Sequence, residues 1–253
     1  MEESCKPVLN TGLRGVTIAS TKISDVNGAE GKLVYRGYLV KDLAGKTSFE
    51  EVIYLLLFER LPDGGELAEI TKQIAEQRAV PDAILSAMKD MPKDALPMDV
   101  LQAAVPMMAN HDPDIRNTDI DSAGRMAVRL IAKFPTIVAA WDRIRNGKEP
   151  VAPDPSLSQA ANFLYMLNGE VPDDELAGFM DTALVLHAEH SFNASTFAAR
   201  EVASTKAHMY AAIAAGVGSL SGPLHGGANT RVMQMLLEIG DVDKVDDYIS
   251  ETL

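Results

Sequence analysis

Histidines are concentrated in the least charged and most Ala/Gly-rich part of the chain, where their spacing could support chemistry. His187 and His190 are three residues apart, so on a helix they would project to one face. With Glu189 between them they could hold a metal ion, although this is not the i, i+4 spacing of zinc proteases. A hydrogen-bonded structural pair and a ligand-binding pair are the alternatives.

Asn193 and Ser195 follow within about one helical turn, and neither residue type favours a helix interior. One interpretation is a local break at which both side chains bond the backbone. The other is a polar rim that donates hydrogen bonds to a carboxylate or a thioester oxygen. Both interpretations fit the residue types.

The most distinctive pattern surrounds His225. Residues 221–229 read Ser-Gly-Pro-Leu-His-Gly-Gly-Ala-Asn and precede an amphipathic run. Proline and three glycines predict a loop that enters a helix and that could also act as a hinge. The helix start disfavours an imidazolium, and a neutral imidazole that donates one N–H suits a developing enolate oxygen. The alternative is a turn whose histidine only packs.

Other common catalytic motifs are missing. The sequence has no Gly-x-x-x-x-Gly-Lys-Ser/Thr loop, and residues 218–222 place Leu220 where a nucleophile elbow requires serine. Cys5 is the single cysteine, which excludes an internal disulfide and a cysteine-based zinc cluster. We therefore expect no metal in the site.

Composition narrows the class of protein. The 253 residues carry a formal net charge of -13, which argues against nucleic acid as a partner. The acidic segment 1–11 lacks the apolar core of a signal peptide, and no apolar run approaches the roughly 20 residues that span a bilayer. We expect a soluble, cytoplasmic protein without membrane contact.

The pattern of elements is helical almost throughout. Residues 15–37 are rich in Val, Ile, Thr and Tyr, and Asn27-Gly28 predicts the tight turn of a small hairpin. Ser48 and Glu51 form a capping-box signature for a helix that ends near 61–64. Further helices are predicted at about 66–78, 81–90, 97–109 and 119–145.

The second half continues the helical pattern. Asn146-Gly147 predicts a left-handed cap, and Asp154 is expected to cap a helix that begins at Pro155 and ends at Asn168-Gly169. Asp173 or Asp174 then caps a long apolar segment that reaches into the 200s. Nothing after residue 40 alternates with period two for long, so the predicted class is all-α. Apolar spacing after Gly240 reaches Leu253 without a closing residue, so we expect the sequence to stop within an element.

Two motifs resemble the central motifs of citrate synthases. These are residues 186–197, which read Leu-His-Ala-Glu-His-Ser-Phe-Asn-Ala-Ser-Thr-Phe, and residues 222–229, which read Gly-Pro-Leu-His-Gly-Gly-Ala-Asn. Segments 31–37 and 152–167 add supporting matches. The resemblance covers the whole chain in order, and it implies condensation of acetyl-CoA with oxaloacetate and water to citrate and CoA. Alternatives are a 2-methylcitrate synthase that uses propionyl-CoA and a non-catalytic binding or assembly module.

The resemblance also implies roles for particular residues. His225 matches the histidine that hydrogen-bonds the thioester carbonyl and stabilises the enol, and we count Ser195 with it as catalytic. His190 matches the histidine that holds oxaloacetate, and Ser195 and Asn193 match the polar positions beside it. His187, grouped with the substrate-binding residues, matches a family histidine whose role we expect to be mainly structural. Acetyl-CoA is then a co-substrate, and no permanently bound cofactor is implied.

The implied fold is a multi-helical large domain over residues 1–226, which carries dimerisation and part of the active site. Residues 227–253 would begin a small domain. In this family the general-base aspartate, a second catalytic histidine and the oxaloacetate-binding arginines lie beyond the point that matches Leu253. The resemblance thus implies a homodimer. It also implies that this chain alone lacks part of the family's catalytic residues. Helices 97–109 and 205–220 also carry apolar residues on more than one face, which favours dimerisation.

Overall fold

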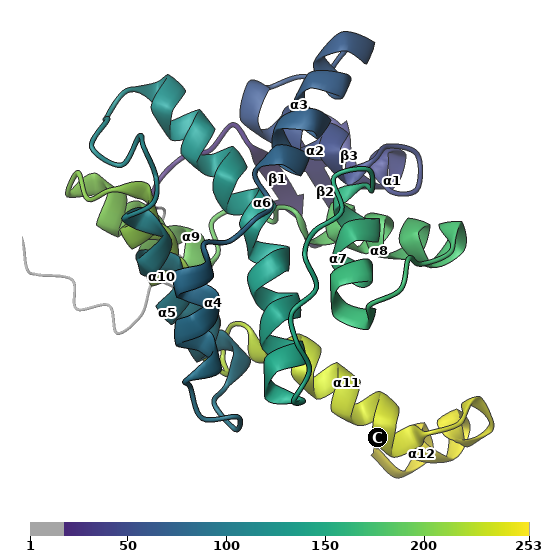
Figure 1. Cartoon of the computed structure of the whole chain (residues 1–253). Helices are drawn as coiled ribbons and strands as arrows, with labels where there is room; N and C mark the ends of the chain where they lie inside the picture. The colour runs from purple at the N-terminus through teal and green to yellow at the C-terminus, as the bar shows by residue number, and fades with distance from the viewer. Residues whose placement is uncertain (1–17, 253) are drawn as a thin grey trace, which may run out of the picture.

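A computed structural model describes residues 18–252, and α-helices make up most of them (Figure 1). The strands in this range are β1 (Ser24–Asn27), β2 (Lys32–Tyr35) and β3 (Tyr38–Leu39). They form one antiparallel sheet in the order β1-β2-β3. The all-α class is thus confirmed, with strands confined to the segment before residue 40. Cys5, the segment 1–11, the start of the predicted hairpin and Leu253 lie outside the described residues.

The helices follow the sheet in chain order. They are α1 (Val40–Leu43), α2 (Phe49–Phe58), α3 (Gly64–Glu76), α4 (Asp82–Lys89), α5 (Pro97–Ala109), α6 (Ile120–Arg145), α7 (Gln159–Asn168), α8 (Asp174–His187), α9 (Ala194–Ser204), α10 (Met209–Leu220), α11 (Gly227–Ile239), the 3-10 helix η1 (Val242–Lys244) and α12 (Val245–Thr252).

Local capping chemistry explains several of these bounds. Ser48 and Glu51 form the predicted reciprocal capping box at the start of α2. At the end of α6, Gly147 is left-handed with φ 71°, and the N–H of Lys148 donates to the carbonyl of Arg143 at 2.8 Å. Each of these bonds satisfies a backbone group that the helix itself leaves without a partner.

Three details of the sequence-based elements were wrong. The hairpin turn spans four residues, 28–31, because Asn27 pairs with Lys32, and a third strand extends the sheet. Helix α2 ends earlier than predicted, since Glu59 adopts a left-handed conformation with φ 71°. The long segment after Asp173 is interrupted at residues 188–193, between α8 and α9.

Asp154 does not cap a helix, which is a fourth correction. Ser158 caps α7 instead, accepting from the N–H of Ala161 at 3.2 Å. The backbone of Asp154 is held by tertiary contacts, because its carbonyl accepts from Arg78 Nη1 at 2.8 Å and its N–H donates to Asn162 Oδ1 at 2.8 Å. These bonds to buried side chains hold the connector against the core, and the helix starts four residues later than Pro155.

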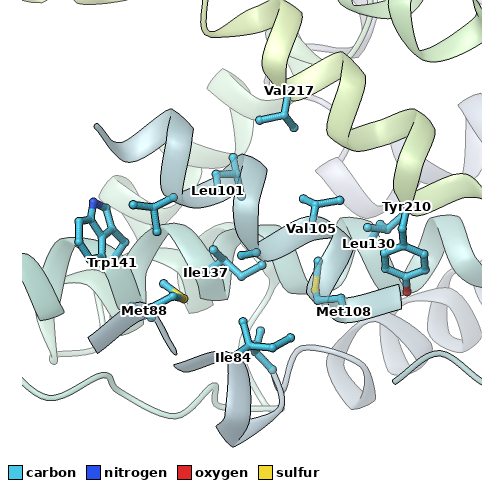
Figure 2. Close-up of a cluster of buried hydrophobic side chains, with 14 of the residues drawn as sticks. Ile84, Met88, Leu101, Val105, Met108, Leu130, Ile137, Trp141, Tyr210 and Val217 are labelled. Carbon is cyan, nitrogen blue, oxygen red and sulfur yellow. The ribbon is translucent and has the colours of Figure 1, made fainter. Parts of the chain in front are cut away.

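The main hydrophobic core lies between α4, α5, α6 and α10 (Figure 2). Its buried side chains include Ile84, Met88, Leu101, Val105, Met108, Leu130, Ile137, Trp141, Tyr210 and Val217. Because α5 packs against α4, α6 and α10, several of its faces are covered within the chain. Burial of this kind of apolar area supplies the dominant stabilising term for such helices.

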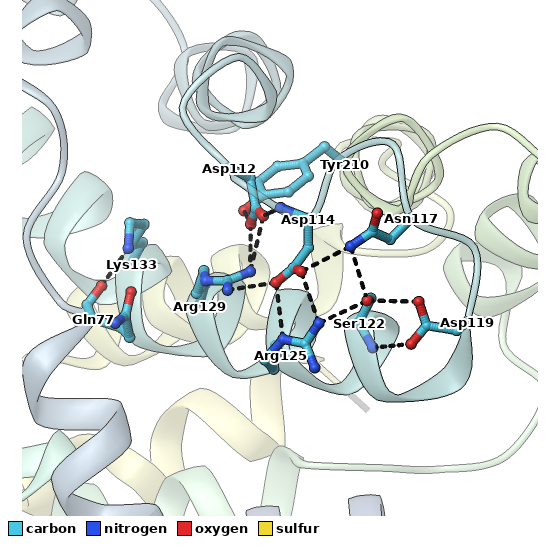
Figure 3. A network of polar contacts seen from close by, with 10 residues as sticks. All are labelled: Gln77, Asp112, Asp114, Asn117, Asp119, Ser122, Arg125, Arg129, Lys133 and Tyr210. Carbon is cyan, nitrogen blue, oxygen red and sulfur yellow. Dashed lines mark hydrogen bonds and ion pairs between the residues drawn. The ribbon is translucent and has the colours of Figure 1, made fainter.

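A polar network borders this core at the connection from α5 to α6 (Figure 3). Arg129 pairs with Asp112 at 2.8 Å and with Asp114 at 2.6 Å, and Arg125 pairs with Asp114 at 2.7 Å. Hydrogen bonds from Arg125 and then Arg129 hold the pKa of Asp114 well below its usual range. The buried hydroxyl of Tyr210 donates to Asp112 at 2.6 Å, which ties α10 to this network.

The segment from α11 to α12 projects from the helical body (Figure 1). Apolar side chains on α11 are exposed, among them Met233, Leu236 and Leu237. Within residues 18–252, no helix combines the length and the apolar character needed to cross a membrane.

Candidate functional site

Two closely packed helices place the candidate site. Small residues line the contact between α9 and α10, and a methyl group on Gly216 would lie 3.3 Å from the Ser195 carbonyl oxygen and 3.6 Å from Ala199 Cβ. A Cβ there would press on the Ser195 backbone. Gly216 therefore lets α10 approach the first turn of α9.

The turn after α10 carries His225. The N–H groups of His225 and Gly226 both donate to the Gly222 carbonyl at 3.0 Å, which closes a compact turn directly before α11. A Cβ on Gly226 would overlap the Leu220 carbonyl oxygen, so this position requires glycine for close backbone approach. The turn brings His225 back toward the start of α9.

Four of the predicted site residues form one series of polar contacts. Ser195 Oγ lies 3.0 Å from His225 Nε2 and donates to Asn193 Oδ1 at 2.6 Å. Asn193 Nδ2 lies 3.3 Å from His190 Nε2. Residues 190, 193, 195 and 225, which come from two separate segments, thus line one polar arrangement at the start of α9.

The backbone of Ser195 constrains the His225 ring. The N–H of Ser195 points to His225 Nε2 at 3.2 Å, and a backbone N–H can only donate. Nε2 therefore acts as an acceptor in this contact and the ring proton belongs on Nδ1. The tautomer is assigned from this hydrogen bond. It leaves Nδ1–H of a neutral imidazole as a donor for another group.

Asn193 bonds the backbone at a local helix break, as the first of its two interpretations predicts. As the N-cap of α9, its Oδ1 accepts from the N–H of Thr196 at 2.8 Å. The same oxygen accepts from Ser195 Oγ, and the amide nitrogen faces His190. The helix cap thus also places the Asn193 side chain between Ser195 and His190.

His187 is not joined to this series. It is the last residue of α8, and its Nδ1 lies 2.7 Å from the Ala183 carbonyl oxygen in the same helix. Since α8 ends there, His187 and His190 do not share a helix face, which corrects the i, i+3 expectation. Among residues 18–252, no group of three or more His, Cys, Asp or Glu side chains is arranged to hold a metal ion.

Sequence reasoning missed the contacts of Glu189. Its side chain accepts from Ser24 Oγ on β1 at 2.9 Å, so it faces the N-terminal sheet rather than the two neighbouring histidines. Residues 24 and 189 are far apart in the chain, and no local pattern connects them. Only a signal for long-range contact could have identified this partner.

A cavity of about 480 Å³ lies apart from the polar series, beside the network of Figure 3. Lys133, Arg129, His111 and Tyr210 contribute to its lining. Burial lowers the pKa of Lys133, whose ammonium donates to the Gln77 carbonyl at 2.5 Å. None of the five predicted site residues lines this cavity.

Comparison with known families and sequences gives a consistent result. Residues 12–253 match the family model described as citrate synthase, C-terminal domain. A citrate synthase from Deinococcus radiodurans is 43% identical over 242 residues, which cover 96% of this chain and 64% of that protein. A 2-methylcitrate synthase from Mycobacterium tuberculosis is 41% identical over 248 residues, covering 98% of this chain and 63% of the relative. The chain thus spans less than two thirds of the length of these relatives.

Solved structures show the same likeness. The citrate synthase of Pyrobaculum aerophilum superposes with a TM-score of 0.88 at 40% identity, over 95% of this chain and 62% of that structure. Citrate synthase from Thermoplasma acidophilum, solved as a ternary complex with carboxymethyl coenzyme A and oxaloacetate, gives a TM-score of 0.86 at 30% identity, over 94% of this chain and 63% of that structure.

Proposed function

This chain belongs to the citrate synthase family, and we propose that it forms part of the active site of an enzyme that condenses acetyl-CoA with oxaloacetate. The observation that carries the proposal is the contact series from His190 through Asn193 and Ser195 to His225. It brings two candidate hydrogen-bond donors to the start of one helix, one for the thioester oxygen and one for a carboxylate of oxaloacetate.

His225 would act on the acyl-CoA. With Nε2 accepting from the Ser195 N–H, the Nδ1–H is free to donate to the thioester carbonyl oxygen. Removal of a methyl proton places negative charge on that oxygen, so the hydrogen bond strengthens as the enolate forms. A donor that is already oriented needs no reorganisation at that moment, which favours the transition state over the ground state. We assign no residue of this chain as the base that removes the proton.

His190 and Asn193 would act on the second substrate. Both side chains are polar, His190 is exposed, and both belong to the series of contacts that ends at His225. Donors of this kind suit the carboxylate and ketone oxygens of oxaloacetate, whose ketone carbon is attacked by the methyl carbon of the enolate. Hydrolysis of the resulting thioester releases CoA and leaves the tricarboxylate product.

The length of the acyl group is a separate question. Relatives of similar identity carry the names citrate synthase and 2-methylcitrate synthase, and the residues assigned above act on the thioester rather than on the acyl tail. We infer acetyl-CoA as the preferred donor and propionyl-CoA as the competing candidate. We further infer a cytoplasmic homodimer.

Release of CoA thiol on mixing the protein with acyl-CoA and oxaloacetate tests the proposal. The expected result is oxaloacetate-dependent thiol release, faster with acetyl-CoA than with propionyl-CoA. The reverse preference would favour 2-methylcitrate synthesis. Calorimetric binding of oxaloacetate without turnover would favour the non-catalytic module, and absence of both binding and turnover would contradict the proposed site.

A further inference from the structure

Glu189 lies between two histidines in the sequence but is bonded to the N-terminal sheet. Its carboxylate accepts from Ser24 Oγ at 2.9 Å and from the backbone N–H of Ser191. Its own N–H donates to Tyr35 Oη at 3.3 Å. The residue that directly precedes His190 is thus held at its side chain and its backbone.

The anchor on the sheet is firm because Tyr35 is fully buried. The Tyr35 hydroxyl lies 3.1 Å from the Val185 carbonyl oxygen and 3.3 Å from that of Leu186, in the last turn of α8. The Val185 carbonyl also accepts from the N–H of Ala188 at 3.4 Å, and the phenol adds a shorter contact at this helix end, where the last carbonyls lack their usual helical partners. One buried side chain on β2 therefore secures both the end of α8 and the turn that follows it.

Ser191 adopts an unfavourable backbone conformation in that turn. Its φ is 75°, in the left-handed region that residues with a Cβ seldom occupy. Such strain persists only where surrounding contacts hold it, and the Glu189 carboxylate accepts the Ser191 N–H. Ser191 separates His190 from the segment that leads to Asn193. The directions of both side chains consequently depend on this one left-handed residue.

We propose that Glu189 is a positioning residue, whose carboxylate links Ser24 of β1 to the left-handed Ser191 and thereby sets how His190 and Asn193 face a carboxylate substrate. This rests on the proposed function, which makes His190 and Asn193 the oxaloacetate donors. The required property is a fixed acceptor oxygen. A glutamine can supply it and an alanine cannot.

The test compares four variants of the whole chain with the wild type. Glu189→Ala removes the acceptor, Glu189→Gln retains one, and Glu189→Ala combined with Ser191→Gly removes the acceptor together with the conformational penalty. Glu201→Ala is the matched control, since Glu201 is an exposed glutamate on α9 whose side chain makes no hydrogen bond or ion pair with the described residues. Two properties are measured, namely the ring ¹⁵N signals of His190 by NMR and the calorimetric Kd of oxaloacetate.

We expect Glu189→Ala to shift the His190 signals and to weaken oxaloacetate binding about tenfold, because the Ser191 N–H and the Ser24 hydroxyl lose their acceptor and the turn that orients His190 is released. Glu189→Gln and Glu201→Ala should leave both properties within about twofold of wild type. Ser191→Gly should restore part of the affinity in the alanine background. Should Glu189→Ala fail to fold, Ser24→Ala, which removes one of the two donors to the carboxylate, is expected to give a smaller shift of the same signals.

Unmoved His190 signals in Glu189→Ala, or equal shifts in the alanine and glutamine variants, would overturn the proposal. So would shifted signals with unchanged oxaloacetate affinity, which would leave Glu189 a structural role only. A wild-type protein that binds no oxaloacetate would contradict the proposed function instead, and the His190 signals would still decide whether Glu189 positions the ring.

Discussion

His225 accepts a hydrogen bond from the backbone N–H of Ser195, and this contact decides which ring nitrogen carries the proton. The Ser195 hydroxyl is close to the same nitrogen but donates to Asn193 at the shorter distance. At the scale of single residues, the site therefore depends on a backbone donor that side-chain substitution does not remove. The substitutions that affect it most directly are those of the ring itself or of the turn that holds it.

The two site histidines should respond differently to substitution. His225→Ala is expected to lower kcat by about 10²–10³ with little effect on oxaloacetate binding, because its hydrogen bond strengthens only as the enolate forms. His190→Ala should first weaken oxaloacetate binding, since a donor to a bound carboxylate contributes in the ground state and the transition state alike. Steady-state kinetics with both substrates varied, together with calorimetry, measure the contrast. A near-normal kcat in His225→Ala would show that the turn only packs.

Gly226→Ala should disturb the site more than the same change at Gly222. A Cβ at 226 overlaps the Leu220 carbonyl, whereas one at 222 lies 3.5 Å from the Ser219 carbonyl oxygen, an ordinary contact. We expect a loss of about 1–3 kcal/mol of stability for Gly226→Ala, as for other overpacked positions, and a displaced His225. Urea unfolding and the ring signals of His225 measure the two effects. Equal behaviour of the two variants would contradict the close-approach argument.

At the scale of elements, α10 connects the core to the candidate site. Tyr210, near its start, donates to Asp112 in the buried network. Gly216, in its middle, leaves room for the Ser195 backbone, and the turn after the helix end carries His225. A shift of α10 would therefore change the Ser195–His225 distance. The polar network in Figure 3 helps to set the position of this helix.

This network should make the free energy of unfolding depend on pH in the acidic range. The pKa of Asp114 is lowered in the folded protein by hydrogen bonds from Arg125 and Arg129, so the unfolded chain binds protons first as pH falls. The stabilisation is present at neutral pH and should be lost progressively below about pH 5, as the unfolded aspartate titrates near its ordinary value. Urea midpoints across this range measure it.

Asp114→Asn provides the comparison. It should be less stable than wild type at neutral pH and should lose less of its remaining stability on acidification. Asp94→Asn, at an exposed position without an ion pair among the described residues, is the control and should follow the wild-type curve. Parallel curves for wild type and Asp114→Asn would show that the Asp114 pairs do not contribute to the acid dependence.

At the scale of the whole molecule, the described surface leaves large apolar side chains uncovered. Phe179 on α8 is 65% exposed and Leu237 on α11 is 73% exposed. The sequence had suggested spare apolar faces on 97–109 and 205–220, but α5 and α10 pack on each other and on neighbouring helices. The exposed apolar residues on α8 and α11 are now a stronger reason than those two helices to expect a partner surface.

We predict that the protein sediments as a dimer at micromolar concentration, because association would cover apolar surface of this kind. Sedimentation velocity over a range of protein concentrations measures the oligomeric state. A monomer throughout that range would contradict the prediction and would leave these faces to another partner.

Local patterns in the sequence determined the fold class and many element bounds. Ser48 and Glu51 cap α2, and Gly147 ends α6, because capping depends on residues within a few positions of each other. The same local reasoning placed His225 on a turn before a helix. It failed at Asp154, whose backbone is also bonded by Arg78, which is far from it in the sequence, and by Asn162 in the next helix.

The arrangement of the candidate site was decided by tertiary structure. His225 reaches Ser195 across 30 positions of sequence, and Glu189 reaches Ser24 across 165. The motifs identified which residue types are present, but the series of contacts arises only when α9 packs on α10 and α8 ends against the sheet. Hydrogen bonds between distant segments depend on how whole elements pack, and no periodicity within one segment encodes that geometry.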